Sequence, residues 1–322
     1  YIFFESVLIR MFLVIGVWGS RERKIRAVYL FFFYTLIGSL FMLLAILYLY
    51  NKAGTTNYDV LLSLELSTAE QNWLFLAFFF SLATKMPLFP FHVWLPEAHV
   101  EAPTAGSVLL AGILLKLGSY GFLRFSIPFF PDASVYFTPL IFTLSILGII
   151  FTSLTAMRQT DFKRIIAYSS VAHMNLVMMG IFSFHLPGIA SALFFLIGVI
   201  YERYHSRLIT YYSGLVHMMP IYIIIFLFFT MANIALPGTS SFIGEFLILA
   251  GLYKFNIIAG ILGATGMILG SAYSLWLYNR IAYGNLKIEY ISSYKDITLR
   301  EFYIFLPLIL GTLVLGIFPN IV

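Results

Sequence analysis

Four charged side chains lie deep within long apolar stretches of the sequence: Glu5, Lys85, Lys116 and Glu245. If these stretches cross a lipid bilayer, each charge costs about 3 kcal/mol unless it is paired or hydrated. Burial disfavours the charged form of carboxylates and of ammonium groups alike, so these residues can exchange protons through intervening water. We therefore expect a proton relay, with Glu5 and Glu245 as the only acidic residues inside the spans. The alternative is that the four residues form two static ion pairs that hold helices together.

Two stretches interrupted by proline carry or adjoin these charges. Lys85 comes just before Pro87 and Pro90, and Pro237-Gly238 precedes Glu245. Proline removes a backbone donor and clashes with the carbonyl group one turn back, so a continuous helix cannot run through either stretch. Inside a bilayer the freed backbone groups need partners from protein or from a water-filled cavity. A charged, broken helix indicates an ion or proton site. The alternative for Lys85 is a simple kink whose lysine reaches to the headgroups.

The remaining polar residues in apolar stretches are less informative. Arg10 either pairs with Glu5, five residues earlier, or lies at the water boundary. His173 either joins the relay or packs as a hydrogen-bonded core residue. His92 and His99 do not predict a haem site, which would need matched histidines on two facing helices. The sequence shows no metal-ligand spacing and no glycine-rich phosphate loop, so no metal or cofactor site is expected.

Composition places the chain among polytopic membrane proteins. Of its 322 residues 61% are hydrophobic and 10% are charged, whereas soluble domains have about 25% charged residues. The absence of cysteine excludes disulfides and iron–sulfur clusters held by thiolates. The net charge of +5 is explained by membrane topology, so a nucleic-acid partner is not expected.

The chain accommodates ten membrane crossings. They are expected at 1–18, 28–50, 72–103, 105–125, 136–157, 165–184, 189–201, 215–253, 256–282 and 302–322. The crossing at 189–201 has only 13 residues, where a span needs about 20. Either this helix is re-entrant or an internal segment is missing near 187–190.

The distribution of basic loops decides how the two interrupted stretches cross. If 72–103 and 215–253 each form one discontinuous crossing, most of the lysine and arginine falls on one side of the membrane, and the acidic 51–70 loop falls on the other. The basic loops in question are 20–26, 158–164, 202–207 and 280–300. Two broken crossings about five crossings apart indicate an inverted repeat, because an odd number of crossings reverses orientation.

The stretch from Lys85 to Ser107, KMPLFPFHVWLPEAHVEAPTAGS, resembles the central motif of the antiporter-like membrane-arm subunits of respiratory complex I, of the mitochondrial type. Similar stretches follow at 3–9, 20–46, 112–125, 152–175, 201–209 and 235–249, so the resemblance covers nearly the whole chain. It implies an all-α polytopic membrane protein with an antiporter-like inverted repeat of five-helix units and two discontinuous helices. Residues 1–125 then end the first repeat, 136–282 form the second, and 302–322 form a C-terminal helix.

The resemblance also implies a function. Such a subunit pumps protons, driven by NADH:ubiquinone oxidoreduction elsewhere in the complex. In this family the glutamate that matches Glu5 pairs with the lysine that matches Lys85. The residue matching Lys116 links onward along a hydrated axis, and the one matching Glu245 lies on the exit half.

The same resemblance implies a setting for the chain. FMN, iron–sulfur clusters and ubiquinone are expected in other subunits, with no cofactor in this chain. Neighbouring antiporter-like subunits, other membrane-arm subunits and lipids are the expected partners. The mitochondrial inner membrane is the expected location, in preference to a bacterial plasma membrane.

Three departures from the family pattern keep alternatives open. Helices that relatives carry before Tyr1 are missing, and the segment between Pro187 and Ala190 lacks a Ser-His-Gly whose histidine belongs to the relay. Arg10 stands where relatives are expected to have proline. The alternatives are a subunit of a cation/proton antiporter, which shares the fold, a non-transporting scaffold, and a redox subunit that binds haem or quinone.

Overall fold

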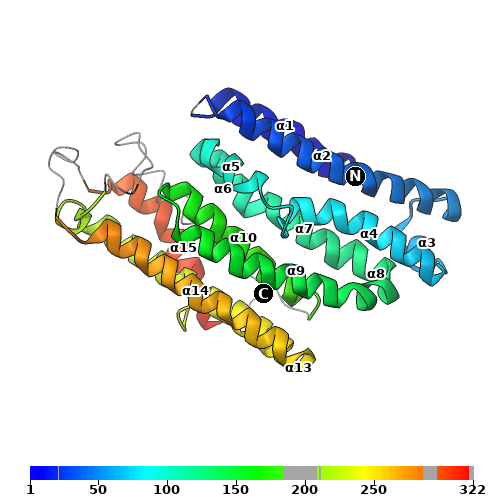
Figure 1. Cartoon of the computed structure of the whole chain (residues 1–322). Helices are drawn as coiled ribbons and strands as arrows, with labels where there is room; N and C mark the ends of the chain where they lie inside the picture. Colours follow the sequence, from blue (N-terminus) through cyan, green and yellow to red (C-terminus); the bar gives the residue numbers. More distant parts are fainter. Residues whose placement is uncertain (21, 184–208, 210–211, 286–295, 319–322) are drawn as a thin grey trace.

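The structure is a computed structural model that describes residues 1–20, 22–183, 209, 212–285 and 296–318. Every regular element in these ranges is helical (Figure 1). The longer helices are α1 (Ile2–Trp18), α2 (Lys24–Ala53), α4 (Thr68–Lys85), α5 (Trp94–Glu101), α9 (Pro131–Met157), α10 (Phe162–Ile181), α12 (Pro220–Asn233), α13 (Ser240–Phe255), α14 (Ile257–Ala282) and α15 (Leu299–Ile317). The short elements α3 (Tyr58–Leu62) and η4 (Leu215–His217) lie in connections. The all-α class is therefore confirmed.

The expectation of several membrane crossings is also confirmed. Among the described residues, α2, the helical stretch Thr104–Phe129, α9, α14 and α15 are long and apolar enough to cross a bilayer. Large apolar side chains such as Leu44, Leu147 and Ile268 are exposed on the outer surfaces of these helices, as expected for contact with lipid.

Most helix boundaries lie close to those expected. α9 begins at Pro131, five residues before the expected 136, because proline is tolerated in the first turn of a helix and Asp132 is favourable there. The expected crossing at 189–201 and the segment near 187–190 lie outside the described residues.

The helix expected to break within 72–103 does so directly after the lysine. α4 ends at Lys85 and α5 begins at Trp94, with Pro87 and Pro90 in the irregular connection. The indole Nε1–H of Trp94 donates a 2.8 Å hydrogen bond to the carbonyl oxygen of Thr84. Thus a carbonyl group freed at the end of α4 finds a partner inside the protein, as the bilayer requires.

A second helix contributes to the same break. Asn175 of α10 donates from Nδ2 to the carbonyl oxygen of Pro87 at 3.4 Å and to that of Val171 at 2.8 Å. The break in α4–α5 is therefore held both by its own tryptophan and by a buried amide from α10.

The second break lies between α12 and α13. α12 ends at Asn233 and α13 begins at Ser240, with Pro237 and Gly238 in the connection as expected. Gly238 has φ 95°, in the left-handed region where glycine is free of strain. The hydroxyl of Ser241 donates to the carbonyl oxygen of Ala232, which occupies one acceptor left free at the end of α12.

Glycines on neighbouring helices allow close packing against both breaks. A Cβ added to Gly118 would lie 2.8 Å from the backbone nitrogen of Met86, the residue after Lys85. A Cβ added to Gly316 of α15 would meet the carbonyl oxygen of Gly238. In both places a helix approaches a broken backbone at a distance that no larger residue permits.

The helix that carries Lys116 and Gly118 is irregular. The stretch Thr104–Phe129 consists of α6 (Thr104–Leu109), the π-helical turn η1 (Leu110–Leu114), α7 (Leu115–Gly121), a second π-helical turn η2 (Phe122–Ser126) and α8 (Ile127–Phe129). π-Helical turns widen the helix locally and occur frequently at functional sites. These turns were not predicted from the sequence.

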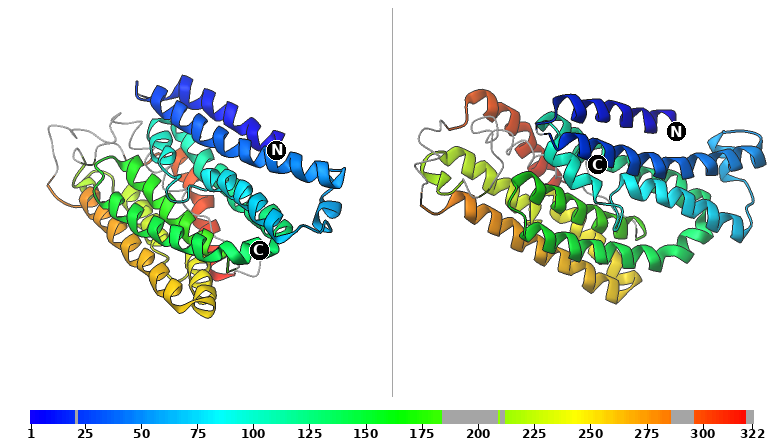
Figure 2. Two further views of the ribbon diagram at one scale, coloured as in Figure 1. Left: turned by 45° about the vertical axis from the view of Figure 1, so that its right-hand side comes forward. Right: turned by 45° about the horizontal axis from the view of Figure 1, so that its top comes forward.

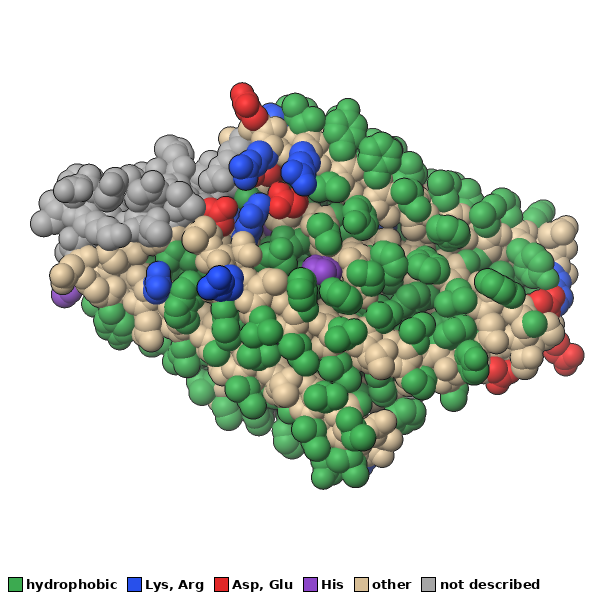
Figure 3. Space-filling model, viewed as in Figure 1, with side chains coloured by type: hydrophobic (Ala, Val, Ile, Leu, Met, Phe, Trp, Pro, Cys, Tyr) green, Lys and Arg blue, Asp and Glu red, His purple; other side chains and the backbone are tan. Residues whose placement is uncertain are grey.

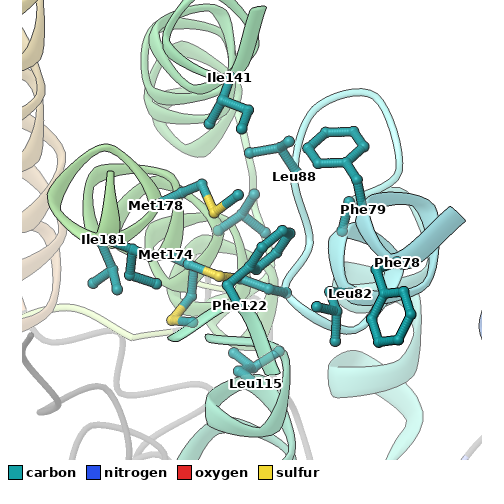
Figure 4. Close-up of a cluster of buried hydrophobic side chains, with 14 of the residues drawn as sticks. Phe78, Phe79, Leu82, Leu88, Leu115, Phe122, Ile141, Met174, Met178 and Ile181 are labelled. Atoms are coloured by element: carbon teal, nitrogen blue, oxygen red, sulfur yellow. The ribbon is translucent and has the colours of Figure 1, made fainter. Parts of the chain in front are cut away.

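α10 lies at the centre of the molecule. Its side chains are buried along almost its whole length, and it packs against α9, α5, α13, α14 and α7. Figure 4 shows Met174, Met178 and Ile181 of α10 facing an apolar cluster that includes Leu88 and Phe122. A second apolar cluster, around Phe226 and Tyr278, lies among α10, α12 and α14.

The helices run roughly along one direction in all three ribbon views (Figures 1 and 2). In Figure 1 the α1–α2 connection and the end of α14 lie toward the left, whereas α3 lies at the right. The basic 20–26 loop and the acidic 51–70 loop are thus at opposite ends, as the charge distribution predicted. On the face shown in Figure 3, most Lys and Arg side chains gather on the left half. We call the left end the basic end.

Candidate functional site

Glu5 and Lys85 form a buried ion pair at the first break. The Nζ of Lys85 lies 3.7 Å from Oε1 of Glu5 and 3.4 Å from the carbonyl oxygen of Phe4. It also lies 4.6 Å from the centroid of the Phe4 ring, within range of a cation–π interaction. Only 3% of Lys85 is exposed. Because Lys85 is the last residue of α4, the negative end of the helix dipole also favours its positive charge.

Lys116 belongs to the helix that packs against the first break. Gly118, two residues further on, packs against Met86, the residue after Lys85. The Nζ of Lys116 donates a 2.6 Å hydrogen bond to the carbonyl oxygen of Ala111 in the π-helical turn η1. Among the described residues no carboxylate lies within 4.0 Å of it, so the backbone of its own widened helix stabilises this ammonium group.

Further charged residues are buried near α5, which the sequence analysis missed. Glu101 is 1% exposed, so Glu5 and Glu245, the two acidic residues expected inside the spans, are not the only buried carboxylates. Lys163, expected in a basic loop, belongs to α10, is 1% exposed and donates to the carbonyl oxygen of Ala102 at 2.8 Å. His99 is fully buried and interacts electrostatically with Lys163 and Lys116.

A local signal for these residues was present but ambiguous. Glu97, His99 and Glu101 stand at every second position between Pro96 and Pro103, within the stretch 72–103 that was expected to form one crossing. In the same region Arg164 pairs with Glu97 at 2.7 Å, and both side chains are half-buried. Only tertiary packing distinguishes the fully buried residues from this pair.

Glu245 and His173 form the second pair. Nδ1 of His173 lies 3.3 Å from Oε1 of Glu245, and Glu245 is 4% exposed. Nε2 of His173 is buried and has no hydrogen-bond partner among the described residues. His173 was expected either to join the proton relay or to pack as a hydrogen-bonded core residue. Its contact with Glu245 favours a place in the relay.

α10 connects the two breaks. Asn175 contacts Pro87 in the first break, and His173 contacts Glu245 just after the second. Residues two apart on an α-helix point about 200° away from each other, so α10 presents one side chain to each break. The structure therefore brings Glu5 to Lys85 and His173 to Glu245, with α10 between the two pairs, while Lys116 lies on a helix that packs against the first break.

Arg10 does not belong to this set. Its side chain is exposed, and Glu5 pairs with Lys85 instead. His92 packs against the ring of Phe89. Among the described residues, no group of three His, Asp or Glu side chains is arranged to hold a metal ion.

Residues 1–271 match the family described as NADH:quinone oxidoreductase/Mrp antiporter, TM. The chain is 59% identical to NADH-ubiquinone oxidoreductase chain 4 of Marchantia polymorpha and 58% identical to the protein of that name in Arabidopsis thaliana. Each match covers 100% of this chain and 68% of the relative. Both run over 334 positions, more than the 322 residues of this chain, so both relatives carry residues that have no counterpart here.

Solved structures of related complexes have the same fold as this chain. A chain of respiratory complex I from Thermus thermophilus with bound NADH superimposes with a TM-score of 0.90 at 34% identity, over 99% of this chain and 70% of that one. The membrane-bound sulfane sulfur reductase, an archaeal respiratory membrane complex, gives a TM-score of 0.87 at 21% identity over 99% of this chain and 68% of that one, which shows a shared fold.

Proposed function

This chain belongs to the NADH:quinone oxidoreductase/Mrp antiporter family of transmembrane subunits, and we propose that it translocates protons as a chain 4-type subunit of respiratory complex I. It is part of a proton-translocating NADH:ubiquinone oxidoreductase and crosses the mitochondrial inner membrane several times. The redox reaction takes place in other subunits, and this chain couples to it through its buried charges.

The Glu5–Lys85 pair at the first break is the observation that carries the proposal. A lysine that is 3% exposed keeps its proton only while a counter-charge is close, and Glu5 is 3.7 Å away. Moving α1 relative to α4 changes that distance and hence the free energy of holding the proton on Lys85. A pair built on two separate helices, next to a break in one of them, is suited to bind and release a proton in turn.

The other buried groups extend the relay. Lys85 binds and releases the proton, Lys116 passes it along the interior, and Glu245 with His173 delivers it toward the far side. The close packing of Gly118 on Met86 and the position of α10 between the two breaks support this order. Each transfer needs water between the groups, because side chains of this kind exchange protons only over hydrogen-bond distances.

The binding partners of this chain are inferred from its family and from its exposed apolar surface. Other membrane-arm subunits, in particular neighbouring antiporter-like ones, and lipids cover the exposed apolar faces of helices such as α1, α2 and α14. FMN, iron–sulfur clusters and ubiquinone belong to other subunits, and the buried groups of this chain handle protons alone. The alternative, a subunit of a cation/proton antiporter, is not favoured, since the relatives at 57–59% identity are named as complex I chains.

Replacing Lys85 tests the proposal. In the assembled complex Lys85→Met is expected to abolish proton pumping, because methionine keeps the length and apolar stem of the side chain but cannot carry a proton. Assembly and electron transfer from NADH to an artificial acceptor are expected to persist. Lys254→Met is the matched control, since Lys254 is exposed at the end of α13. NADH-driven acidification of sealed vesicles at the normal rate in Lys85→Met, with that of the control unchanged, would refute the relay.

A further inference from the structure

We propose that Tyr273 of α14 extends the path from Glu245 toward the basic end, by passing protons between two buried cavities that each hold one water molecule. This inference rests on the proposed function and adds a positioning and proton-passing residue to the same site. Neither Tyr273 nor the side chains that line the second cavity belong to the relay described above.

Two small cavities meet at Tyr273. The first lies beside the Glu245–His173 pair, has a volume of about 10 Å³, and is also lined by Asn233, Gly270 and Tyr273. The second has the same volume of about 10 Å³ and is lined by Asn233, Tyr273, Ser169, Thr230 and Ser274 among others. A volume of about 10–15 Å³ accommodates one water molecule, provided that two to four polar partners surround it. Both cavities meet that condition.

The polar atoms at the second cavity are arranged to accept hydrogen bonds from water. Ser169 and Thr230 each donate their hydroxyl hydrogen to a backbone carbonyl group of their own helix, at 2.8 Å in both cases. Their oxygens are thus left as acceptors. Asn233 donates from Nδ2 to Ser274 Oγ at 3.1 Å. The remaining lining of this cavity is apolar, so a water there is fixed by these groups.

Tyr273 is the group that both cavities share and that can carry a proton. It is 2% exposed, and its hydroxyl interacts with Asn233 and Ser169. A phenol oxygen both donates and accepts. In one step protonated Glu245 gives its proton to the water in the first cavity, that water gives one of its hydrogens to the Tyr273 oxygen, and the hydroxyl hydrogen of Tyr273 moves to the water in the second cavity, which becomes hydronium and passes the proton on. Rotation of the hydroxyl then restores the starting state. Asn233, which lines both cavities as well, has no proton to exchange in this way and positions the waters.

The second cavity lies nearer the basic end than the first on two helices, α10 and α12. Ser169 precedes His173 by one turn of α10, which begins at the basic end. Thr230 precedes Asn233 on α12, whose start adjoins the end of α14 through the Gly214–Tyr283 backbone hydrogen bond. The two positions give the path a direction. Apolar side chains that include Phe226 and Leu277 close the second cavity on its side toward the basic end.

Two variants test the link by different means. Tyr273→Phe removes only the hydroxyl. Gly270→Ala puts a methyl group into the first cavity, where its sole neighbour within 4 Å is the Tyr273 hydroxyl at 3.7 Å, so it fits without strain but takes the space of the water. The matched control is Gly311→Ala, a helical glycine of α15 with nothing within 4 Å.

Proton pumping per NADH oxidised is measured in vesicles that contain the whole complex. We expect a fall of about tenfold or more for Tyr273→Phe and for Gly270→Ala, since a lost proton-transfer group typically costs about 10²–10⁴-fold. Gly311→Ala is expected to match the unaltered complex. If Tyr273→Phe does not assemble, Gly270→Ala decides, because it adds one methyl group in open space.

A comparison with Glu245→Gln separates this inference from the proposed function. Loss of pumping in Glu245→Gln with full pumping in both Tyr273→Phe and Gly270→Ala would overturn the Tyr273 link and leave the relay intact. Full pumping in Glu245→Gln would instead remove this carboxylate from the relay. If the two residues act on one path, Tyr273→Phe added to Glu245→Gln causes no further loss, a non-additivity that a purely structural role of Tyr273 would not produce.

Discussion

At the first break, partners from outside the broken turn hold the backbone: the Trp94 indole binds the Thr84 carbonyl oxygen and the Asn175 amide binds that of Pro87. At the second break the partners are local hydroxyl groups, since Ser241 binds the Ala232 carbonyl oxygen and Thr239 lies 3.1 Å from Ser241. Pro87 is buried and Pro90 is exposed in the first break, whereas Pro237 and Gly238 are both exposed in the second. The start of the first break, around Pro87, is therefore more deeply buried than Pro237 and Gly238.

The charges differ in the same way. Lys85 ends the helix before the first break and pairs with a carboxylate from α1, whereas Glu245 follows the second break and pairs with a histidine. In the first pair Lys85 is 3% and Glu5 17% exposed, so the lysine depends on that carboxylate for its charge, while Glu245 lies beside an imidazole and a small cavity. The two interruptions thus differ in the group that faces the buried charge.

The largest expected effect is steric and distinguishes the packed break from the exposed one. In Gly118→Ala the new Cβ would lie 2.7 Å from Met86 Cβ and 2.8 Å from its backbone nitrogen, neither of which can rotate away. Overpacking of this kind costs about 1–3 kcal/mol or more, so we expect little assembled complex on native gels.

Gly238→Ala provides the comparison at the second break. No atom lies within 4 Å of the added Cβ there, and its cost is the left-handed φ of 95° alone, about 1–2 kcal/mol. Complex yields that fall less than in Gly118→Ala support the distinction. A normal yield of Gly118→Ala would show that the first break is not tightly packed.

An intermediate effect is expected from the hydrogen bond that ties Trp94 to Thr84. Trp94→Phe keeps an aromatic ring but leaves a buried carbonyl oxygen without its donor, which costs about 1–3 kcal/mol. We expect a lower midpoint of thermal inactivation of the complex. Trp73→Phe is the control, because Trp73 is 75% exposed. Equal midpoints for the two variants would mean that water, and not the indole, satisfies the first break.

The smallest effect sharpens the contrast between buried and exposed ion pairs. Lys52 and Glu70 pair at 2.7 Å near the acidic loop, with side chains 34% and 26% exposed. Solvent and salt weaken such a pair, and Glu70 keeps its bonds to the Ser67 backbone and hydroxyl when the lysine is removed. Lys52→Met is therefore expected to leave assembly and pumping unchanged in the same vesicle assay. A loss comparable to that of Lys85→Met would mean that exposure does not separate the two pairs.

Local chemistry made the breaks predictable. Proline cannot continue a helix and bilayer depth makes a charge costly, so Lys85, Pro87 and Pro237 could be identified from the sequence without any knowledge of the fold. The pairing of Glu5 with Lys85 was not in the residue pattern itself, and it entered through the family resemblance. The structure has the two side chains in contact.

The parts that escaped prediction depend on long-range packing. Lys163 and Glu101 are buried because α5, α10 and the α1–α2 connection meet there, as the bond from Ser20 N–H to the Glu101 carbonyl oxygen shows. Nothing local marks Glu101 as more buried than Glu97, four residues earlier. The π-helical turns around Lys116 and the cavities beside Tyr273 likewise arise from helix packing, since serine, threonine and tyrosine are common in spans.

His173 and Asn175 belong to the same turn of α10, which moves as a rigid unit. A twist of α10 about its own axis that draws His173 away from Glu245 must also swing Asn175 across the Pro87 carbonyl oxygen, in the opposite sense in space. The two breaks are consequently coupled mechanically through α10, because a rotation of one turn of this helix moves both side chains at once.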